Sequence, residues 1–333
     1  MVLAAGGCPG GAARLSLLVA IALAAPYPLG QALAPEAGPA AFLTWARPGP
    51  VVPGLQEDAV PQGLAWLPEQ RLWLVTHYRD DGPSVLSVLD ADGHLVTVSS
   101  LLEPPGVAHD GHVGGVCVAA GRVWIGSRTV VWSAPLEHVL AGPDELLLTP
   151  HTVDSRASFV TCEADRVWVG EFARYPVLGK RYKTEPHHHH PDRDGDRRYA
   201  WAYGYRIVGE GLAPAPDKRL SLPDETQGLA FVGDRVVLSR SYGRDTPSRI
   251  EVHHDRRGKD LFLDEQTLDF EVAAPPLAEG LAAHPVGVAV LFESAATPYR
   301  KGSVLQVDQV LLVDLEGLRS RGPVVRIPGV EGE

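Results

Sequence analysis

The sequence has little positive charge. Its 30 Lys and Arg residues are outnumbered by 41 Asp and Glu residues, so the formal net charge at pH 7 is -11. Binding to nucleic acid depends largely on a basic surface that attracts phosphates. We therefore expect no nucleic-acid partner, and the acidic balance favours solubility.

Several motifs that mark common enzyme classes are missing. The chain has no glycine-rich phosphate loop followed by Lys and Ser or Thr, no Gly-x-Ser-x-Gly turn and no His-Glu-x-x-His pair. These patterns hold phosphates, expose a nucleophilic serine and bind catalytic zinc, respectively. Each of these three kinds of site therefore lacks its signature in this sequence.

Long apolar runs are also scarce, and the one at the N-terminus is too short to span a membrane. Residues 15–25 carry no charge and follow Arg14, whereas a spanning helix needs about 20 apolar residues. Ala32-Leu33-Ala34 then has the small-x-small pattern of a cleavage site. The sequence predicts a signal peptide over residues 1–34.

Removal of this signal peptide would leave a secreted, extracellular chain that does not associate with a membrane. Residues 35–50 are rich in Ala, Gly and Pro, and we predict that they form a flexible leader. Residues 51–333 are predicted to form one domain.

Helical periodicity is absent after the leader, whereas turn residues are abundant. The 35 Gly and 29 Pro residues are spread along the chain, which is typical of many short strands joined by turns. One strand-turn-strand unit recurs five times. Its copies join residues 62–66 with 71–76, 114–118 with 122–127, 158–162 with 166–171, 227–231 with 235–240, and 279–283 with 287–293.

Each copy combines a strand of small and apolar residues, a tight turn and a strand of β-branched or aromatic residues. The copies begin about 45 to 70 residues apart, which fits propeller blades of about 40–50 residues with insertions. Further strand patterns bring most repeats to about four strands. The sequence therefore predicts an all-β, five-bladed β-propeller, with a six-bladed propeller as the alternative. Tandem repetition argues against a β-sandwich.

Segments in and beside these copies resemble a known group of proteins. They are Pro61-Gln62-Gly63-Leu64, His112-Val113-Gly114-Gly115, Trp168-Val169-Gly170-Glu171-Phe172, Gln227-Gly228-Leu229-Ala230, Ser241-Tyr242-Gly243-Arg244, Glu279-Gly280-Leu281 and Leu291-Phe292-Glu293-Ser294. The chain resembles secreted bacterial β-propeller proteins of uncharacterised role, and more loosely the SMP-30/strictosidine-synthase-like and YncE-like propellers. This resemblance covers most of the chain after the signal peptide. It implies a propeller fold and brings no set of functional residues that matches position by position.

Polar residues recur at one end of the repeated unit. In a propeller blade, the first strand begins and the second strand ends on the same face, near the axis, so these positions surround one mouth. The opening positions are Gln62, Gly114 with His112 before it, Ser158, Gln227 and Glu279. The closing positions are Thr76 with His77, Ser127 with Arg128, Glu171, Arg240 with Tyr242 nearby, and Glu293.

These residues suggest catalytic and binding roles. Neighbouring carboxylates can divide acid and base roles because proximity raises one pKa. The catalytic candidates are Glu279, Glu293, Glu171 and, as an auxiliary base, His112. The substrate-binding candidates are Gln62, His77, Arg128, Gln227, Arg240 and Tyr242. The carboxylates and amides also suit a divalent cation such as calcium, which prefers oxygen ligands. Alternatively, these groups only hydrogen-bond strand ends and trapped water.

Two kinds of function fit such a mouth. The first is a secreted enzyme, a hydrolase or lyase, that acts on a small polar or carbohydrate-like substrate. The second is a non-catalytic extracellular propeller that binds a ligand or a protein, and fold alone does not choose between them. Carboxylates about 5–10 Å apart in an open pocket favour acid/base chemistry. We expect a monomer.

An insertion over residues 172–199 lies on the same face as the predicted mouth. It contains His187 to His190, followed by Asp192, Asp194 and Asp196. A His-rich tract beside carboxylates can bind a transition metal, but four consecutive histidines cannot all face one ion. We favour a lid over the mouth, with a metal site as the alternative.

Two cysteines, Cys117 and Cys162, remain after the predicted signal peptide. They lie on the first strands of neighbouring repeats. A disulfide needs Cα atoms within about 7 Å, whereas packed sheets lie about 10 Å apart. Two buried thiols are therefore favoured over a disulfide, although an exported protein meets the oxidising conditions in which a bridge persists.

Overall fold

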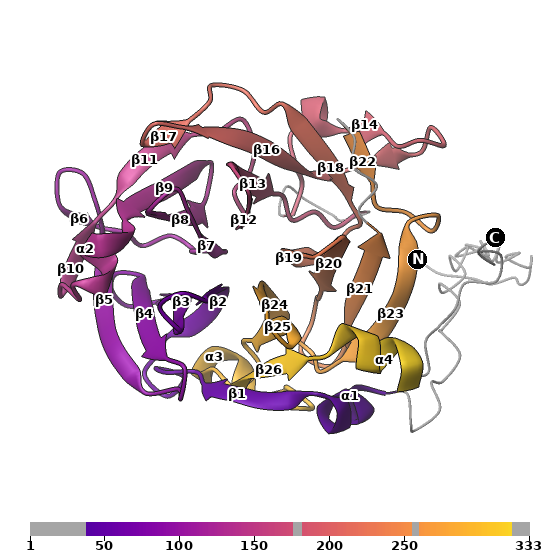
Figure 1. Cartoon of the computed structure of the whole chain (residues 1–333), viewed down its shortest axis with the longest axis horizontal. Coiled ribbons are helices and arrows are strands. Elements are labelled where there is room, and N and C mark those ends of the chain that lie inside the picture. Colours follow the sequence, from indigo (N-terminus) through magenta and orange to yellow (C-terminus); the bar gives the residue numbers. More distant parts are fainter. Residues whose placement is uncertain (1–37, 176–181, 255–259, 322–333) are drawn as a thin grey trace, which may run out of the picture. The chain divides into compact units, whose positions relative to one another are not determined.

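Five β-sheets surround a central axis in the computed structural model, which describes residues 38–175, 182–254 and 260–321 (Figure 1). Each sheet is a blade, and its first inner strand lies nearest the axis. The prediction of a five-bladed β-propeller is confirmed. The predicted signal peptide lies outside the described residues and stays a prediction.

The blades are numbered here in chain order. Blade 1 contains β2 (Val60–Leu67), β3 (Leu72–Tyr78), β4 (Val85–Asp90) and β5 (Leu95–Glu103). Blade 2 contains β7 (Val116–Ala119), β8 (Arg122–Ser127), β9 (Val130–Pro135) and β11 (Thr149–Thr152). Blade 3 contains β12 (Phe159–Glu163), β13 (Arg166–Gly170), β16 (Ala200–Val208) and β18 (Lys218–Leu222). Blade 4 contains β19 (Thr226–Val232), β20 (Arg235–Arg240), β21 (Ser248–His254) and β23 (Leu268–Ala274). Blade 5 contains β24 (Ala278–His284), β25 (Gly287–Phe292), β26 (Gln309–Val313) and β1 (Arg47–Val51).

Short elements decorate these blades. The helices are α1 (Pro39–Trp45), α2 (Leu136–Leu140), the 3-10 turn η1 (Pro186–His188), α3 (Thr297–Arg300) and α4 (Leu315–Arg321). The remaining strands are β6 (Val107–Ala108), β10 (Glu145–Leu147), β14 (His190–Pro191), β15 (Arg197–Arg198), β17 (Gly211–Leu212) and β22 (Asp260–Phe262).

The inner hairpin of every blade coincides with the repeated sequence unit. In blade 1, β2 and β3 pair from Val60 opposite Tyr78 to Leu67 opposite Leu72. The second strand of each hairpin is rich in large apolar residues because it is covered by neighbouring blades on both faces. Trp73, Trp124 and Trp168 hold matching positions on these strands, and all three are buried. They pack between neighbouring blades.

The N-terminal segment closes the ring. β1 pairs antiparallel with β26, and Phe42 of the preceding helix α1 is buried against Phe292 of blade 5. The composition of residues 35–50 predicts a flexible leader, whereas Pro39–Trp45 form a helix and Arg47–Val51 form a strand. Without β1, β26 would be an unpaired sheet edge. The sequence of β1 contains two Pro residues and one Gly residue, so it does not show the pattern of a strand. An outer strand tolerates these residues because one of its edges needs no partner.

Two further strands cross from one blade to the next. β10 leaves blade 2 and pairs in parallel with β5 of blade 1, where Leu146 lies opposite Leu101. β22 leaves blade 4 and pairs in parallel with β18 of blade 3. These pairs add backbone hydrogen bonds between blades at their outer edges, far from the axis (Figure 1).

A glycine after each opening Gln or Glu lets neighbouring blades approach at the axis. A Cβ atom on Gly63 would lie 2.6 Å from the carbonyl carbon of Gly115. A Cβ on Gly280 would lie 2.7 Å from the carbonyl oxygen of Gln62. Any side chain at these positions would push two inner strands apart, so close backbone approach explains why glycine recurs in the pattern.

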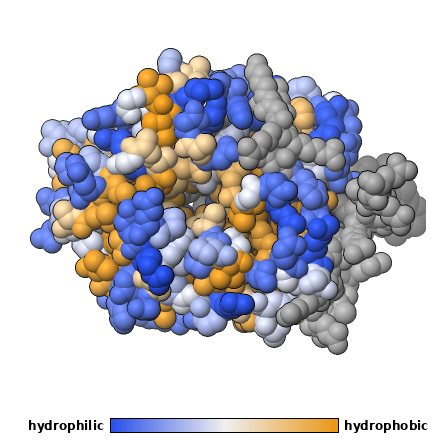
Figure 2. All heavy atoms as spheres, in the orientation of Figure 1, coloured by the Kyte–Doolittle hydropathy of each residue, from blue (hydrophilic) through white to orange (hydrophobic). Residues whose placement is uncertain are grey.

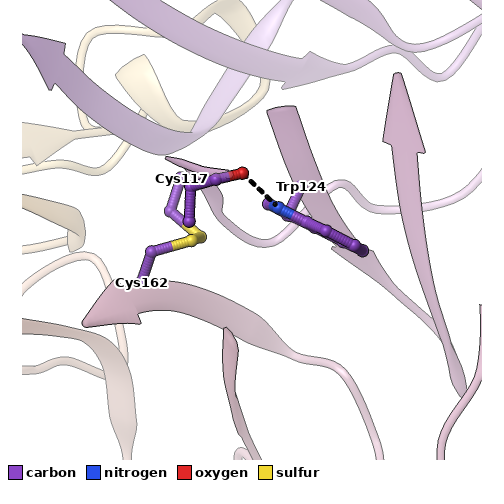
Figure 3. Close-up of a disulfide and its surroundings, with 4 residues drawn as sticks. Cys117, Trp124 and Cys162 are labelled. Atoms are coloured by element: carbon purple, nitrogen blue, oxygen red, sulfur yellow. Dashed lines mark hydrogen bonds between the residues drawn. A yellow bond between two sulfur atoms is a disulfide. The ribbon is translucent and has the colours of Figure 1, made fainter. Parts of the chain in front are cut away.

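Cys117 on β7 and Cys162 on β12 form a disulfide between blades 2 and 3, with their Cα atoms 5.5 Å apart (Figure 3). The inner strands of neighbouring blades converge at the axis, so the usual spacing of packed sheets does not apply there. The two-thiol interpretation is therefore corrected. Beside the bridge, the indole N–H of Trp124 donates a hydrogen bond of 3.1 Å to the carbonyl of Ala119.

Hydrophobic side chains are exposed along β5, β6 and β10 on the outer side of blade 1. They are Leu95, Val96, Val98, Val107 and Leu147. Hydrophobic colour gathers on the same side of the molecule in Figure 2. Within the described part of the chain, no helix is both long enough and apolar enough to cross a membrane. The expected monomeric state stays a prediction.

Candidate functional site

A cavity of about 1190 Å³ opens at the centre of the propeller. All five blades or their connecting loops contribute to its wall. The predicted site residues in this wall are Gln62, His112, Arg128, Gln227, Tyr242, Glu279 and Glu293. The ends of the inner strands therefore converge as the propeller geometry requires.

Glu279 and Glu293 form a pair of carboxyl groups in this cavity. They hydrogen-bond to each other, and both side chains are almost completely buried. Each carboxyl group also accepts a hydrogen bond from an amide: Gln62 Nε2 lies 3.0 Å from Glu293 Oε2, and Gln227 Nε2 lies 2.9 Å from Glu279 Oε1. The pair thus has a defined position and orientation.

Irregular strand starts aim three of these side chains at the axis. The antiparallel register shifts at Gln62 in β2, at Gln227 in β19 and next to Glu279 in β24. A β-bulge turns a side chain away from the regular alternation of the strand. The matching positions in the repeats therefore deliver an amide, an amide and a carboxyl group to the same space.

Burial and proximity keep protons on the carboxyl pair. Burial raises the pKa of Glu279 well above its usual value, and the neighbouring Glu293 raises it further. Burial raises the pKa of Glu293 to about 8, although hydrogen bonds from Glu279 and Gln62 and the charge of Arg244 act in the opposite direction. At neutral pH the pair holds at least one proton.

Aromatic and cationic side chains complete the wall around the pair. Tyr242 lies under the guanidinium of Arg174 at 3.9 Å and against the ring of Tyr182 at 5.7 Å. Tyr299, in helix α3, shares a hydrogen bond of 3.0 Å with Tyr78, and its ring lies under the guanidinium of Arg244. The cavity thus offers ring faces, hydroxyl groups and positive charge to a ligand.

His112 and Arg128 lie in the wall contributed by blade 2 and the loop before it. The His112 ring stacks on Tyr78 at 4.0 Å between centroids. Arg128 pairs with Asp110, and its guanidinium lies 3.7 Å from Glu103. Both residues border the cavity, and their predicted roles as auxiliary base and substrate-binding residue stay hypotheses.

Three of the catalytic and substrate-binding candidates do not line the cavity, namely Glu171, His77 and Arg240. Glu171 is fully buried and its Oε1 lies 2.6 Å from His188 Nδ1. His77 is also fully buried, and burial lowers its pKa to about 3. Thr76 turns toward the next blade, where its hydroxyl donates to Val113 O at 2.8 Å. Because side chains alternate along a strand, His77 points the other way.

Arg240 belongs to a buried network inside blade 4 rather than to the cavity wall. It donates to the carbonyl of Asp224 at 2.9 Å and pairs with Glu251. Burial raises the pKa of Glu251, but His253 and Arg240 lower it to about 2. Arg240 ends β20, and Glu251 lies on the adjacent strand β21, so the two side chains are within reach of each other.

His109, Glu103 and Ser127 form a second arrangement of catalytic type, which no motif in the sequence indicates. His109 Nδ1 lies 2.7 Å from Glu103 Oε1, and its Nε2 lies 3.1 Å from Ser127 Oγ. This is the order of groups in a serine-hydrolase triad. However, Ser127 is fully buried, and a Cβ on Gly111 would lie 2.4 Å from its Oγ. No substrate carbonyl can approach this oxygen, so we assign the arrangement to packing beneath the cavity wall.

We expect Glu293→Gln to change how stability depends on pH. A folded-state pKa above the unfolded one means that the folded protein binds more protons between pH 4.5 and 8. This contribution to stability is present at low pH and is lost as the pH rises toward 8. The melting temperature of the variant, relative to the wild type, should therefore increase from pH 5 to pH 8.

The control for this measurement is Glu145→Gln, which removes a carboxyl group from an exposed position of β10. Its melting temperature relative to the wild type should not change across the same pH range. If the difference in melting temperature between Glu293→Gln and the wild type is also the same at every pH, burial does not raise the pKa of this carboxyl group.

The fold and the cavity define a five-bladed β-propeller with a buried carboxyl pair in its central cavity. No protein-family model matches the sequence, and no curated protein matches it significantly.

Solved structures with a similar backbone include three bacterial proteins. The GH43_1 enzyme from Xanthomonas citri has a TM-score of 0.46 and 11% identity, over 82% of this chain and 91% of that chain. The glutaminyl cyclase from Myxococcus xanthus has a TM-score of 0.42 and 9% identity, over 74% and 90%. The gluconolactonase XC5397 from Xanthomonas campestris has a TM-score of 0.38 and 17% identity, over 75% and 83%. These values carry no activity over to this chain, so the function has to be argued from the cavity.

Proposed function

We propose that this protein is an exported hydrolase that cleaves an ester, lactone or amide bond in a small polar or carbohydrate-like molecule. The observation that carries the proposal is the hydrogen-bonded contact between two buried carboxyl groups, Glu279 and Glu293, in the wall of an open cavity.

A carboxyl pair that shares a proton suits attack of water on a carbonyl group. The ionised carboxylate takes a proton from water while the water oxygen forms a bond to the carbonyl carbon. The protonated partner donates its proton to the carbonyl oxygen. Collapse of the tetrahedral intermediate breaks the bond to the leaving group, which takes a proton from the pair. A hydroxyl group of the intermediate returns a proton to the pair as the carbonyl group forms again. Each cycle consumes one water and restores the shared proton.

The two carboxyl groups are joined by a hydrogen bond, which places them closer than the separation of about 5–10 Å that favours acid/base chemistry across an open pocket. Glycosidases place their two carboxyl groups about 5–5.5 Å apart when they retain configuration, and about 6.5–9.5 Å apart when they invert it. A hydrogen-bonded pair matches neither distance. This difference favours a carbonyl group over a glycosidic bond as the reacting centre.

The wall of the cavity supports a polar substrate with a ring-like body. Tyr182, Tyr242 and Tyr299 supply aromatic surface together with hydroxyl groups, a combination that suits amphipathic ligands. Arg156 and Arg244 also line the cavity and can hydrogen-bond the oxygens of an anionic substituent. Gln62 and Gln227 hold the carboxyl pair in place through their amides.

A divalent cation such as calcium between the two carboxylates is the competing proposal for this cavity. Calcium prefers several oxygen ligands, and the pair with its two glutamines supplies such atoms. A bound cation would require both carboxyl groups to lose their protons. The positive charge of Arg244, which acts on Glu293, opposes a second cation at this position.

Export from the cell is part of the proposal. The predicted signal peptide is one argument for it, and the Cys117–Cys162 disulfide is another. Structural disulfides persist in oxidising compartments outside the cytoplasm.

The test is a substrate panel applied to the protein collected after export from its host. The panel contains sugar lactones, small esters, small amides and nitrophenyl glycosides. Each compound would be incubated with the protein, and its products would be detected by chromatography and by the release of acid. We expect turnover of a carbonyl compound and none of the glycosides. Glycoside cleavage would overturn the proposed reaction, and saturable binding without turnover would favour a non-catalytic propeller. Stabilisation by calcium alone, measured as a shift in melting temperature, would favour the cation proposal.

A further inference from the structure

Three side chains of the kinds that bind metal ions, Asp154, His187 and His188, meet outside the carboxyl pair. His187 Nε2 lies 3.3 Å from Asp154 Oδ1, and His188 Nε2 lies 3.9 Å from the same oxygen. One ligand atom from each residue can be chosen so that all three lie within 4.8 Å of one another. The histidines belong to the blade 3 insertion, whereas Asp154 precedes β12, so the fold brings together two separate chain segments.

A buried carboxylate orients one of these histidines. Glu171 Oε1 lies 2.6 Å from His188 Nδ1, and the Glu171 side chain is fully buried. With the proton of the ring on Nδ1 and directed at Glu171, Nε2 carries the lone pair that faces Asp154. A carboxylate behind a metal-binding histidine is the usual partner that fixes the ring tautomer and orientation.

The surrounding backbone also holds the ligands in place. The backbone N–H of Asp154 donates a hydrogen bond of 3.2 Å to the hydroxyl of Tyr205, whose side chain is buried. On the other segment, Pro186 begins the turn η1, and the N–H of His188 donates to Glu185 O at 2.9 Å. Neither ligand segment depends on the ion for its course.

We propose that His187, His188 and Asp154 bind a zinc-class transition-metal ion, with Glu171 as the positioning residue of His188. Two imidazoles and one carboxylate suit zinc, which binds nitrogen at about 2.0–2.1 Å. Tetrahedral ligands at that distance are separated by about 3.3–3.5 Å, which compares with the 3.3 Å and 3.9 Å between Asp154 Oδ1 and the two histidine nitrogens. Calcium, in contrast, prefers a set of oxygens.

The fourth coordination position would face solvent. The His187 side chain is 59% exposed and that of Asp154 is 81% exposed, so water can complete the site. Three protein ligands and one open position are typical of zinc sites that bind an exchangeable ligand. Asp154 lies two residues before Arg156 in the cavity wall, so an ion here would pin the blade 3 insertion beside the mouth.

A second group of possible ligands supplies the matched control. Asp90, Asp92 and His94 also place ligand atoms within 4.8 Å of one another. Asp90 is already engaged in a local turn, where it accepts hydrogen bonds from the N–H groups of Asp92 and His94. The three ligand atoms come from five consecutive residues on an exposed turn, so we expect no tight site there.

The test is a zinc titration of the full chain, expressed without a histidine tag and treated with a chelator. Calorimetry and competition with a coloured zinc indicator should show one tight equivalent in the wild type. His187→Ala, His188→Ala and Asp154→Asn should each weaken that equivalent at least tenfold, and His94→Ala should leave it unchanged. Absorption of the cobalt(II) form should show the strong bands of four-coordinate cobalt.

Glu171→Gln separates positioning from folding. We expect zinc affinity about 10–100-fold weaker, with the melting temperature of the metal-free protein unchanged. Should this buried substitution unfold the chain, His187→Ala still decides, because the exposed His187 side chain can be removed without a core defect. A wild type without a tight equivalent, or a His187→Ala variant that keeps it, would overturn the site. This result is independent of hydrolysis, because the titration measures binding alone.

Discussion

Glu279→Gln is expected to lower kcat/KM on the substrate found by the panel by about 10²–10⁴-fold, the usual contribution of general acid–base catalysis. The amide has nearly the same shape as the carboxyl group, and its oxygen can still accept the hydrogen bond from Gln227 Nε2. It cannot carry the proton that Glu279 shares with Glu293. The loss should therefore appear in kcat, while the melting temperature stays near that of the wild type.

The comparison needs a variant that removes a carboxyl group elsewhere. Glu145→Gln on the exposed edge of β10 should keep wild-type kcat. In the wild type, activity should also fall as the pH rises through about 8, where Glu293 loses its proton. A Glu279→Gln enzyme with full turnover would return the pair to a structural role.

The double substitution Cys117→Ser and Cys162→Ser is expected to lower the free energy of unfolding by about 2–4 kcal/mol. The bridge joins cysteines 45 residues apart in the sequence. In the chain-entropy model, a loop of this length restricts the unfolded chain by about 4 kcal/mol. The hydroxyls would also be placed in a poorly solvated contact between blades 2 and 3.

This effect is measured by unfolding both proteins in urea without reductant, with circular dichroism recorded at several urea concentrations. Reduction of the wild type should lower its stability by a similar amount and should leave the double variant unchanged. Mass spectrometry after alkylation of the denatured, non-reduced protein supplies the second check. If Cys117 and Cys162 are both alkylated, the bridge does not form in the exported protein.

The repeated unit could be read from the sequence because its pattern is local. Each inner strand alternates or concentrates apolar residues over a few positions, and a turn follows within a short distance. The same pattern identified Gln62, Gln227, Glu279 and Glu293 as polar ends of buried strands. A polar residue at such an end has to face either solvent or a shared cavity, so their convergence followed from the propeller topology.

The direction of a side chain at a strand end cannot be predicted from the local pattern. The sequence alignment matches Arg240 with Glu293, but in the paired strands Arg240 lies opposite Thr226 and matches Phe292, which lies opposite Ala278. Glu293 lies one residue further on and turns to Glu279, whereas Arg240 turns to Glu251 on the neighbouring strand. The direction depends on which partner lies within reach, and that partner is distant in sequence. The same reason hid the contact between Glu171 and His188, 17 residues apart, within the site proposed for zinc.

By itself, the sequence determined the all-β fold class, the five inner hairpins and the positions of the glycines that let the blades meet. These features depend on short-range patterns and on their repetition. Only the tertiary structure decided that β1 closes blade 5, that Cys117 reaches Cys162, and that the two glutamates are close enough to share a proton. Each of these depends on distances between segments remote in the chain. Such distances are set by how tightly five blades pack around one axis, which no local pattern records.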